Sequence, residues 1–286
     1  MLQDRPKSGR HIPQTRPLDT APAQPQVVYL HQLHEKSGDF RHLLMHILLP
    51  VDLLSAFDID PITLRNAAGE VMVEVAQAQE GHVWGVRVLN DIDRRDPLLE
   101  IELTDTVFGR ISVTWVGMND PRAPRFDIDL TPEGEPTLRG TARRHVQAEA
   151  AALLAGLAPG QVRAGLGMFH RLLWDLDQLM AALHHREYEV EPLYYHNAIL
   201  FERAGFVYAQ GRDRMKHLHE AFAAGGELAR RLDGSTPFRD PILAESVRGR
   251  SWALHDGLWE EPWDGIKLVK RIGVQARDLT AGDLLW

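Results

Sequence analysis

A glutamate and four histidines lie at the inner edges of predicted helices, and these side chains are the best suited to chemistry. On helical wheels advancing about 100° per residue, Glu149 falls inside an apolar stripe, while His145, His170, His196 and His219 border such stripes. Imidazole and carboxylate groups bind iron, manganese or zinc, and they also transfer protons. We therefore expect a divalent metal site made of His145, Glu149, His196 and His219, or an acid–base site in the same place.

Glu149 has two interpretations, because a carboxylate on an apolar face must find a cation, a metal ion or a proton. It acts as a metal ligand or general base, or it has a structural role, either in an ion pair with an arginine elsewhere in the chain or at a helix edge where it reaches water. His170 and Asp177 lie two turns apart on one predicted helix, roughly 10 Å along its axis, so each needs a partner from another element. We predict Glu149, His170 and Asp177 as catalytic residues; the alternative is a solvated helix edge.

A second candidate region is the segment 248–257, which reads as a loop and contains arginine, tryptophan, histidine and aspartate. Guanidinium groups bind carboxylates and phosphates through paired hydrogen bonds, so Arg248 and Arg250 are predicted to bind an anionic substrate. His255 and Asp256 would follow as an acid–base or ligand pair, and His255 completes the predicted catalytic set. The alternative is a structural loop whose arginines pair with acidic helix faces.

The chain that positions these residues begins with a β-rich part, residues 27–136. Apolar and polar residues alternate at 71–75, 84–88, 99–103, 111–115 and 126–130. A period of two with one polar face is typical of an antiparallel sheet with one wet side, and the first two segments indicate a hairpin. The run 43–49 is apolar at both parities and predicts a central strand, while 53–57 predicts one short helical turn.

The pattern changes to helical in residues 137–234. Helices are predicted at 141–157, 168–185, 192–206 and 212–232, although Gly225 and Gly226 suggest a break in the last one. Residues 235–286 hold four of the seven tryptophans and read as a loop-rich segment that packs on the junction, with a short strand at 266–272. The fold class is therefore α+β: an N-terminal antiparallel sheet, about four helices and a Trp-containing C-terminal segment.

Composition removes several classes of protein. The chain has 286 residues, 44% of them hydrophobic, 25% charged and no cysteine, so disulfides, thiolate metal sites and cysteine nucleophiles are excluded. A formal charge of −8 without a basic block argues against nucleic acid as a partner, and no apolar stretch reaches the roughly 18 residues of a membrane helix. The proline-rich residues 1–26 indicate an extended arm, and we expect a cytoplasmic protein that binds a small molecule and forms a homo-oligomer through this arm or the C-terminal segment.

One local resemblance concerns residues 197–206, with the sequence Asn-Ala-Ile-Leu-Phe-Glu-Arg-Ala-Gly-Phe. This segment resembles the late helix-into-strand region of GNAT acetyltransferases, which often ends in Tyr-Glu-Lys/Arg-x-Gly-Phe. In that family a strand feeds a Gln/Arg-x-x-Gly-x-Gly/Ala loop that holds the pyrophosphate of coenzyme A. Residues 163–167, Arg-Ala-Gly-Leu-Gly, are similar to that loop with a different spacing, and they follow a predicted helix. The resemblance implies that amides near Gly165 and Gly167 bind coenzyme A.

Three functions follow from these patterns. The first is a soluble enzyme, either a hydrolase or an oxidoreductase, that uses the His/carboxylate site on a small, anionic substrate with or without a divalent metal. The second is a non-catalytic binding or assembly protein, in which the histidines are core-edge residues. The third is the coenzyme A-dependent acyltransferase that the resemblance implies.

Overall fold

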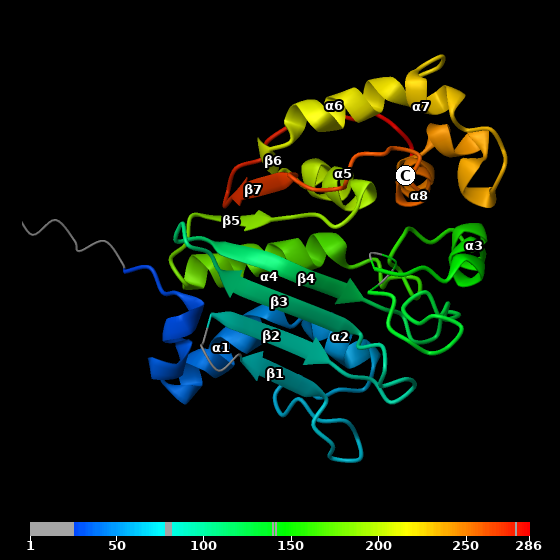
Figure 1. Ribbon diagram of the computed structural model, residues 1–286. Coiled ribbons are helices and arrows are strands. Elements are labelled where there is room, and N and C mark those ends of the chain that lie inside the picture. The colour runs from blue at the N-terminus through cyan, green and yellow to red at the C-terminus, as the bar shows by residue number, and fades with distance from the viewer. Residues whose placement is uncertain (1–25, 78–81, 139, 141, 278) are drawn as a thin grey trace, which may run out of the picture.

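A single mixed sheet crosses most of the molecule (Figure 1). The computed structural model describes residues 26–77, 82–138, 140, 142–277 and 279–286. Seven strands in this part of the chain form the sheet in the order β1-β2-β3-β4-β5-β7-β6. The fold class is α+β, as predicted. The strands are β1 (Val73–Gln77), β2 (Val83–Val88), β3 (Leu99–Asp105), β4 (Ile111–Met118), β5 (Glu187–Val190), β6 (Val207–Gln210) and β7 (Lys267–Arg271).

Strands β1 to β4 form the antiparallel meander that the alternating pattern predicts. Val88 pairs with Val73 on one side and with Leu99 on the other, so buried residues lie in rows across the strands. The opposite face is wet, because Arg87 forms ion pairs there with Glu74 and Glu100. Period-two alternation thus follows directly from having one buried and one solvated face.

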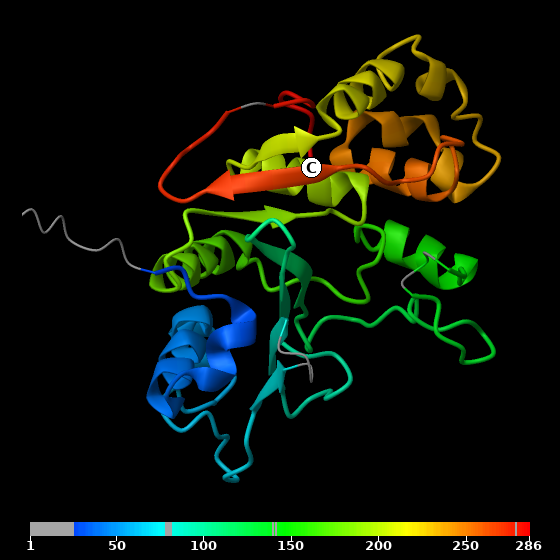
Figure 2. The same ribbon diagram turned by 60° about the vertical axis from the view of Figure 1, so that its left-hand side comes forward.

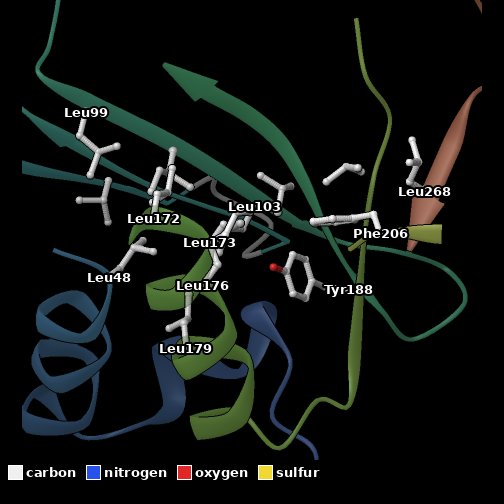
Figure 3. Packing of buried hydrophobic residues seen from close by; sticks show 14 of the residues in the cluster. Leu48, Leu99, Leu103, Leu172, Leu173, Leu176, Leu179, Tyr188, Phe206 and Leu268 are labelled. Carbon is white, nitrogen blue, oxygen red and sulfur yellow. The ribbon is translucent and has the colours of Figure 1, made fainter. Parts of the chain in front are cut away.

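Helices cover the apolar face of this meander. Helix α4 buries Leu172, Leu173, Leu176 and Leu179 on one stripe, and it packs against α1 and the sheet, as Figure 3 shows. Burial of such side chains contributes about 25 cal/mol per Å² of apolar surface. The helices are α1 (Gly38–Leu48), α2 (Val51–Ala56), α3 (Val146–Leu154), α4 (Phe169–Ala182), α5 (Tyr195–Arg203), α6 (Arg212–Ala221), α7 (Glu227–Arg230) and α8 (Val247–His255), with short 3-10 turns η1 (Leu30–Glu35), η2 (Pro237–Arg239) and η3 (Pro241–Glu245).

Two predicted strands are wrong. The run 43–49 lies in α1 and its C-cap. Ser37 caps the start of that helix by accepting a hydrogen bond from the Phe40 amide, and Leu44, Met45 and Leu48 form its buried stripe. Residues 126–130 are not a strand, and only an isolated bridge joins Leu130 to Pro136. There Arg125 draws both Asp127 and Asp129 to itself, so the two carboxylates serve as its partners.

One predicted loop and one predicted helix also differ from the structure. The expected loop 248–257 is mostly helix α8, because Ser246 caps it by accepting from the Gly249 amide. The expected helix 212–232 is interrupted between α6 and α7, as the double glycine suggested. A Cβ atom at Gly226 would lie 2.4 Å from the Ala221 carbonyl oxygen, so the chain turns where only glycine fits.

The later parts of the chain are built into the same sheet. Residues 137–234 supply β5 and β6, and the C-terminal segment supplies β7, which lies between those two strands. Figure 2 shows α6 and α8 gathered above this end of the sheet. Of the predicted arm, residues 1–25 lie outside the described part. No helix in the described residues is long and apolar enough to cross a membrane.

Candidate functional site

Strands β4 and β5 separate after a short parallel ladder. Their register covers Ile111 to Val113 opposite Tyr188 to Val190, and among the described strands this is the one parallel pair. The register of β4 against β3 shifts at the next residue, since Leu103 faces Val113 and Glu102 faces Trp115. Thr114 is therefore the extra residue of a β-bulge. Bulges bend a strand and are common beside active sites, so this one explains why β4 diverges from β5.

The divergence opens a cavity of about 490 Å³ at the carboxyl ends of the two strands. In open α/β sheets, ligands bind outside the carboxyl ends of the parallel strands. The walls come from β4 beyond Val113, from the β5–α5 connection and from the segment before α4. The lining includes Gly156, Gly165, Gly167, Tyr194, His196, Phe201, Arg248 and Trp286.

A glycine-containing loop returns to the end of β4 and opens helix α4. Although residues 119–168 separate the two elements in the sequence, Asp120 donates its amide to the Ala164 carbonyl at 2.9 Å. A Cβ atom at Gly165 would lie 3.5 Å from the Met118 carbonyl oxygen, so this loop adjoins the last residue of β4. Helix α4 begins without a side-chain cap at Met168. Its first amides are thus available to an anion, which a helix N-terminus favours.

The loop is held in place by buried ion pairs. Arg163 donates to Asp96 at 2.7 Å and to Asp93 at 2.5 Å, and it also binds the Ala123 carbonyl. Hydrogen bonding to Arg95 is the largest cause that holds the pKa of the Asp93 carboxyl well below its ordinary value. Arg163 lines the cavity, but its charge is already neutralised. Its role is to fix the glycine loop at the end of β4.

His196 lies inside the wall of the cavity rather than in reach of a metal. Its Nδ1 atom is 2.9 Å from the Ser251 hydroxyl, and its ring stacks on Tyr194. Burial lowers the pKa of His196 to about 3, and the positive charge of Arg248 acts in the same direction. His196 is therefore neutral at physiological pH, and it brings shape and hydrogen bonding to the cleft without charge.

The two arginines predicted to bind an anion have different surroundings. Arg250 is buried, where its Nε donates to the Ala244 carbonyl at 2.7 Å and one terminal nitrogen lies 3.1 Å from His219 Nδ1. The Arg250 guanidinium also covers the Phe222 ring at 5.2 Å. Arg248 is half-buried and lines the cavity. Burial alone lowers its pKa, with no acidic group acting against it.

Glu149 and His255, both predicted as catalytic, lie together although they come from α3 and the end of α8. His255 Nε2 is 3.2 Å from a Glu149 oxygen, and Arg144 donates to the other oxygen at 2.8 Å. Burial opposes the charge of Glu149, but hydrogen bonds from His255 and Arg144 lower its pKa on balance. The arginine of the structural interpretation is thus present as Arg144, and His255 is a partner of Glu149 that the sequence did not predict.

His255 also lines a second cavity of about 470 Å³, which shares Tyr194 with the first. This neighbouring space is lined by Trp259, Trp263 and Ser251 as well. The Tyr194 ring meets His255 edge-on at 5.7 Å between centroids. Tyr194 therefore stands between the Glu149–His255 pair and the cleft at β4.

The remaining predicted residues are dispersed. His145 turns its Nδ1 to the Asp127 and Leu130 carbonyls at 3.0 Å, and His170 is exposed in the first turn of α4. Asp177 accepts a hydrogen bond from Tyr188 at 2.9 Å and pairs with Lys270.

The four predicted metal ligands, His145, Glu149, His196 and His219, do not meet, because their helices do not form one bundle core. Within the described residues, one group has the spacing of metal ligands, and it consists of His31, His82 and Asp105. That group lies outside the predicted set, and whether the protein binds a metal stays untested.

The pattern of the sequence does not identify several residues of the cleft. Tyr194 and Trp286 were not predicted, and the bulge at Thr114 falls within a strand whose alternation looks regular. The bulge is defined by the register of β4 against β3, which the sequence of β4 alone does not contain. Comparison with family models, curated proteins and solved structures found no match for the chain.

Proposed function

We propose that the protein is an acyltransferase that takes its acyl group from a coenzyme A thioester, as the resemblance of residues 197–206 implies. One observation carries the proposal. The parallel strands β4 and β5 diverge at a bulge, and the Gly165–Gly167 loop with the start of α4 stands at the end of β4. The long excursion 119–168 explains why this strand–loop–helix unit cannot be read from the sequence.

The cleft matches the parts of such a donor. A pyrophosphate suits the uncapped start of α4 and the amides of Gly165 and Gly167. The pantetheine arm is extended and carries two amides, so it can lie along a strand edge as a peptide does in β-augmentation. The cavity of about 490 Å³ lies within the usual range for small-molecule and cofactor pockets.

Acyl transfer to an amine forms a C–N bond and breaks the C–S bond of the thioester. The amine loses one proton, and the thiolate that leaves gains one. A bulge frees a backbone amide from the strand ladder, and such donors stabilise the oxyanion that develops on the carbonyl. His255 is oriented by Glu149 and lines the neighbouring cavity, so it is our candidate for the group that accepts the proton of an amine entering from that side.

The chain departs from the family string at one position that lines the cleft. Phe201 stands where the string has tyrosine, so this position offers no hydroxyl. Tyr194, which lines both cavities, is then our candidate to protonate the departing thiolate. Replacement of Tyr194 by phenylalanine should lower the maximal rate more than the affinity for coenzyme A.

Isothermal titration with coenzyme A tests the proposal directly. Wild-type protein should bind, and Gly167→Asp should bind at least about tenfold more weakly, because its carboxylate would occupy the loop and repel the pyrophosphate. Gly134→Asp is the matched control, since Gly134 also has positive φ and nothing within 4 Å of an added Cβ. Failure of the wild-type protein to bind, or equal losses in both variants, would reject the proposal.

A further inference from the structure

We propose that Arg248 binds a carboxylate of the substrate, so that the cleft accepts an acyl group or an acceptor that carries one. This inference rests on the proposed function, because it takes the cleft at β4 as the place where acyl transfer occurs. It adds the chemical class of the substrate. A carboxylate on the acyl donor and a carboxylate on the acceptor are two sources of the same chemistry, and the test below separates them.

The charge of Arg248 is not balanced within the described part of the chain. No hydrogen bond or ion pair from its guanidinium is found there, and its pKa is lowered by burial alone. The other half-buried or buried arginines around the cleft behave differently. Arg144 binds Glu149 and Asp256, and Arg163 binds Asp93 and Asp96. A cation partly removed from water without a counter-ion is costly, so a ligand that supplies the anion would be favoured.

The Arg248 guanidinium lies beside Gly156 at the end of α3. One terminal nitrogen lies 3.0 Å from where a Cβ of Gly156 would be, so the guanidinium rests closely against this glycine. Gly156 directly follows the C-cap of α3, where the exposed carbonyls favour a positive charge. The side chain is thus supported from behind, while its cavity neighbours Tyr194 and Trp286 are aromatic.

The local charge suits a carboxylate better than a phosphate monoester. Arg248 supplies one positive charge, and the nearby His196 stays neutral because burial lowers its pKa to about 3. A carboxylate carries one negative charge and fits the guanidinium fork with two hydrogen bonds. A phosphate monoester carries about −1.5 to −2 at neutral pH, so one guanidinium would leave it partly unbalanced.

The first arm of the test examines the acyl donor by isothermal titration. Succinyl-coenzyme A and butyryl-coenzyme A have the same chain length, but only the first carries a terminal carboxylate. If the carboxylate is on the donor, wild-type protein should bind the succinyl thioester at least about tenfold more tightly. Arg248→Gln should abolish that preference, Arg248→Lys should retain part of it, and the exposed Arg186→Gln control should leave it unchanged.

The second arm examines the acceptor by measuring thiol release from acetyl-coenzyme A. If the carboxylate is on the acceptor, L-amino acids should react at lower KM than the amines formed by their decarboxylation. Arg248→Gln should raise the KM of the amino acids at least about tenfold, without changing the affinity for coenzyme A. Absence of a carboxylate preference in both arms overturns the inference.

Two further outcomes are decisive. If Arg248→Gln weakens binding of coenzyme A but not of dephospho-coenzyme A, the arginine holds a phosphate of the donor and the inference is wrong. If wild-type protein binds no coenzyme A, the proposed function fails by a separate measurement. Arg248 is then tested alone by thermal shift with succinate against succinamide. Stabilisation by succinate that is lost in Arg248→Gln supports a carboxylate site, and its absence rejects one.

Discussion

Arginines are paired differently in two neighbouring regions: the segment 119–168 between β4 and α4, called the excursion here, and the cleft beside it. In the excursion, Arg125, Arg144 and Arg163 each bind two or more carboxylates at close range. In the cleft, Arg248 has no acidic partner among the described residues, and α4 starts without a side-chain cap. Charges that are paired within the fold stabilise the segment that carries them, whereas an unpaired charge is a candidate for binding a ligand. Whether a charged side chain has an oppositely charged partner therefore distinguishes structural from candidate functional residues better than residue type does.

The largest loss of stability is expected when a paired charge is removed. Glu149→Ala should lower the free energy of unfolding by about 3–5 kcal/mol, because Arg144 and His255 would lose their buried carboxylate. Urea unfolding followed by circular dichroism measures this change. Glu133→Ala is the control, since Glu133 is exposed in a turn and its removal should change stability by less than about 0.5 kcal/mol. A small loss for Glu149→Ala would mean that this network is not structural.

The neutral histidine of the cleft gives a second test, through pH. Burial holds the folded-state pKa of His196 at about 3, against 6.5 for the unfolded chain. The unfolded state therefore binds the extra proton below about pH 6.5, and the free energy of unfolding falls as the pH drops from there toward 3. Between pH 6.5 and 4.5 the loss attributable to His196 should be about 2 kcal/mol.

The control for this titration is an exposed histidine. His196→Asn should remove most of that dependence on pH, whereas His34→Asn should preserve it, because His34 is solvent-exposed. Unfolding curves in urea at several pH values between 6.5 and 4.5 provide the measurement. If His196→Asn keeps the full slope, the proton is taken up elsewhere and His196 is not the neutral residue that its burial indicates.

The sequence predicted well the elements that have one wet face. Strands β1 to β4 alternate because Arg87 and its acidic partners face water, and α4 shows a clear stripe because one side packs on the sheet. Short strand β5 has no such pattern, since its Tyr188, Glu189 and Val190 are all buried. A four-residue strand with a buried charge cannot be separated from a helix start by periodicity. The prediction for residues 137–234 therefore had the helices but not the two strands that this part adds to the sheet.

The candidate site divides in the same way. Helical position alone marked Glu149 as a carboxylate that needs a partner, and one partner is Arg144 in the same segment. Its other partner, His255, is 106 positions away, and only the fold brings the two together. Arg248 and Arg250 look equivalent in sequence, because residue type and spacing say nothing about which one finds an acceptor. Long-range pairing is what a single sequence leaves open.

The smallest expected loss of stability is that of Arg248→Gln, and its contrast with Arg250→Gln separates the two arginines. Arg250→Gln should lower the free energy of unfolding by about 1–3 kcal/mol, because the half-buried Ala244 carbonyl and His219 would lose their buried donor. Arg248→Gln, two residues away on the same helix, should not lower it, since the change breaks no bond within the described residues and removes a half-buried charge without a counter-ion. Thermal and urea unfolding of both variants measure the contrast. Equal losses would mean that Arg248 is as structural as Arg250, whereas an unchanged Arg248→Gln protein isolates a charge that the fold itself does not need.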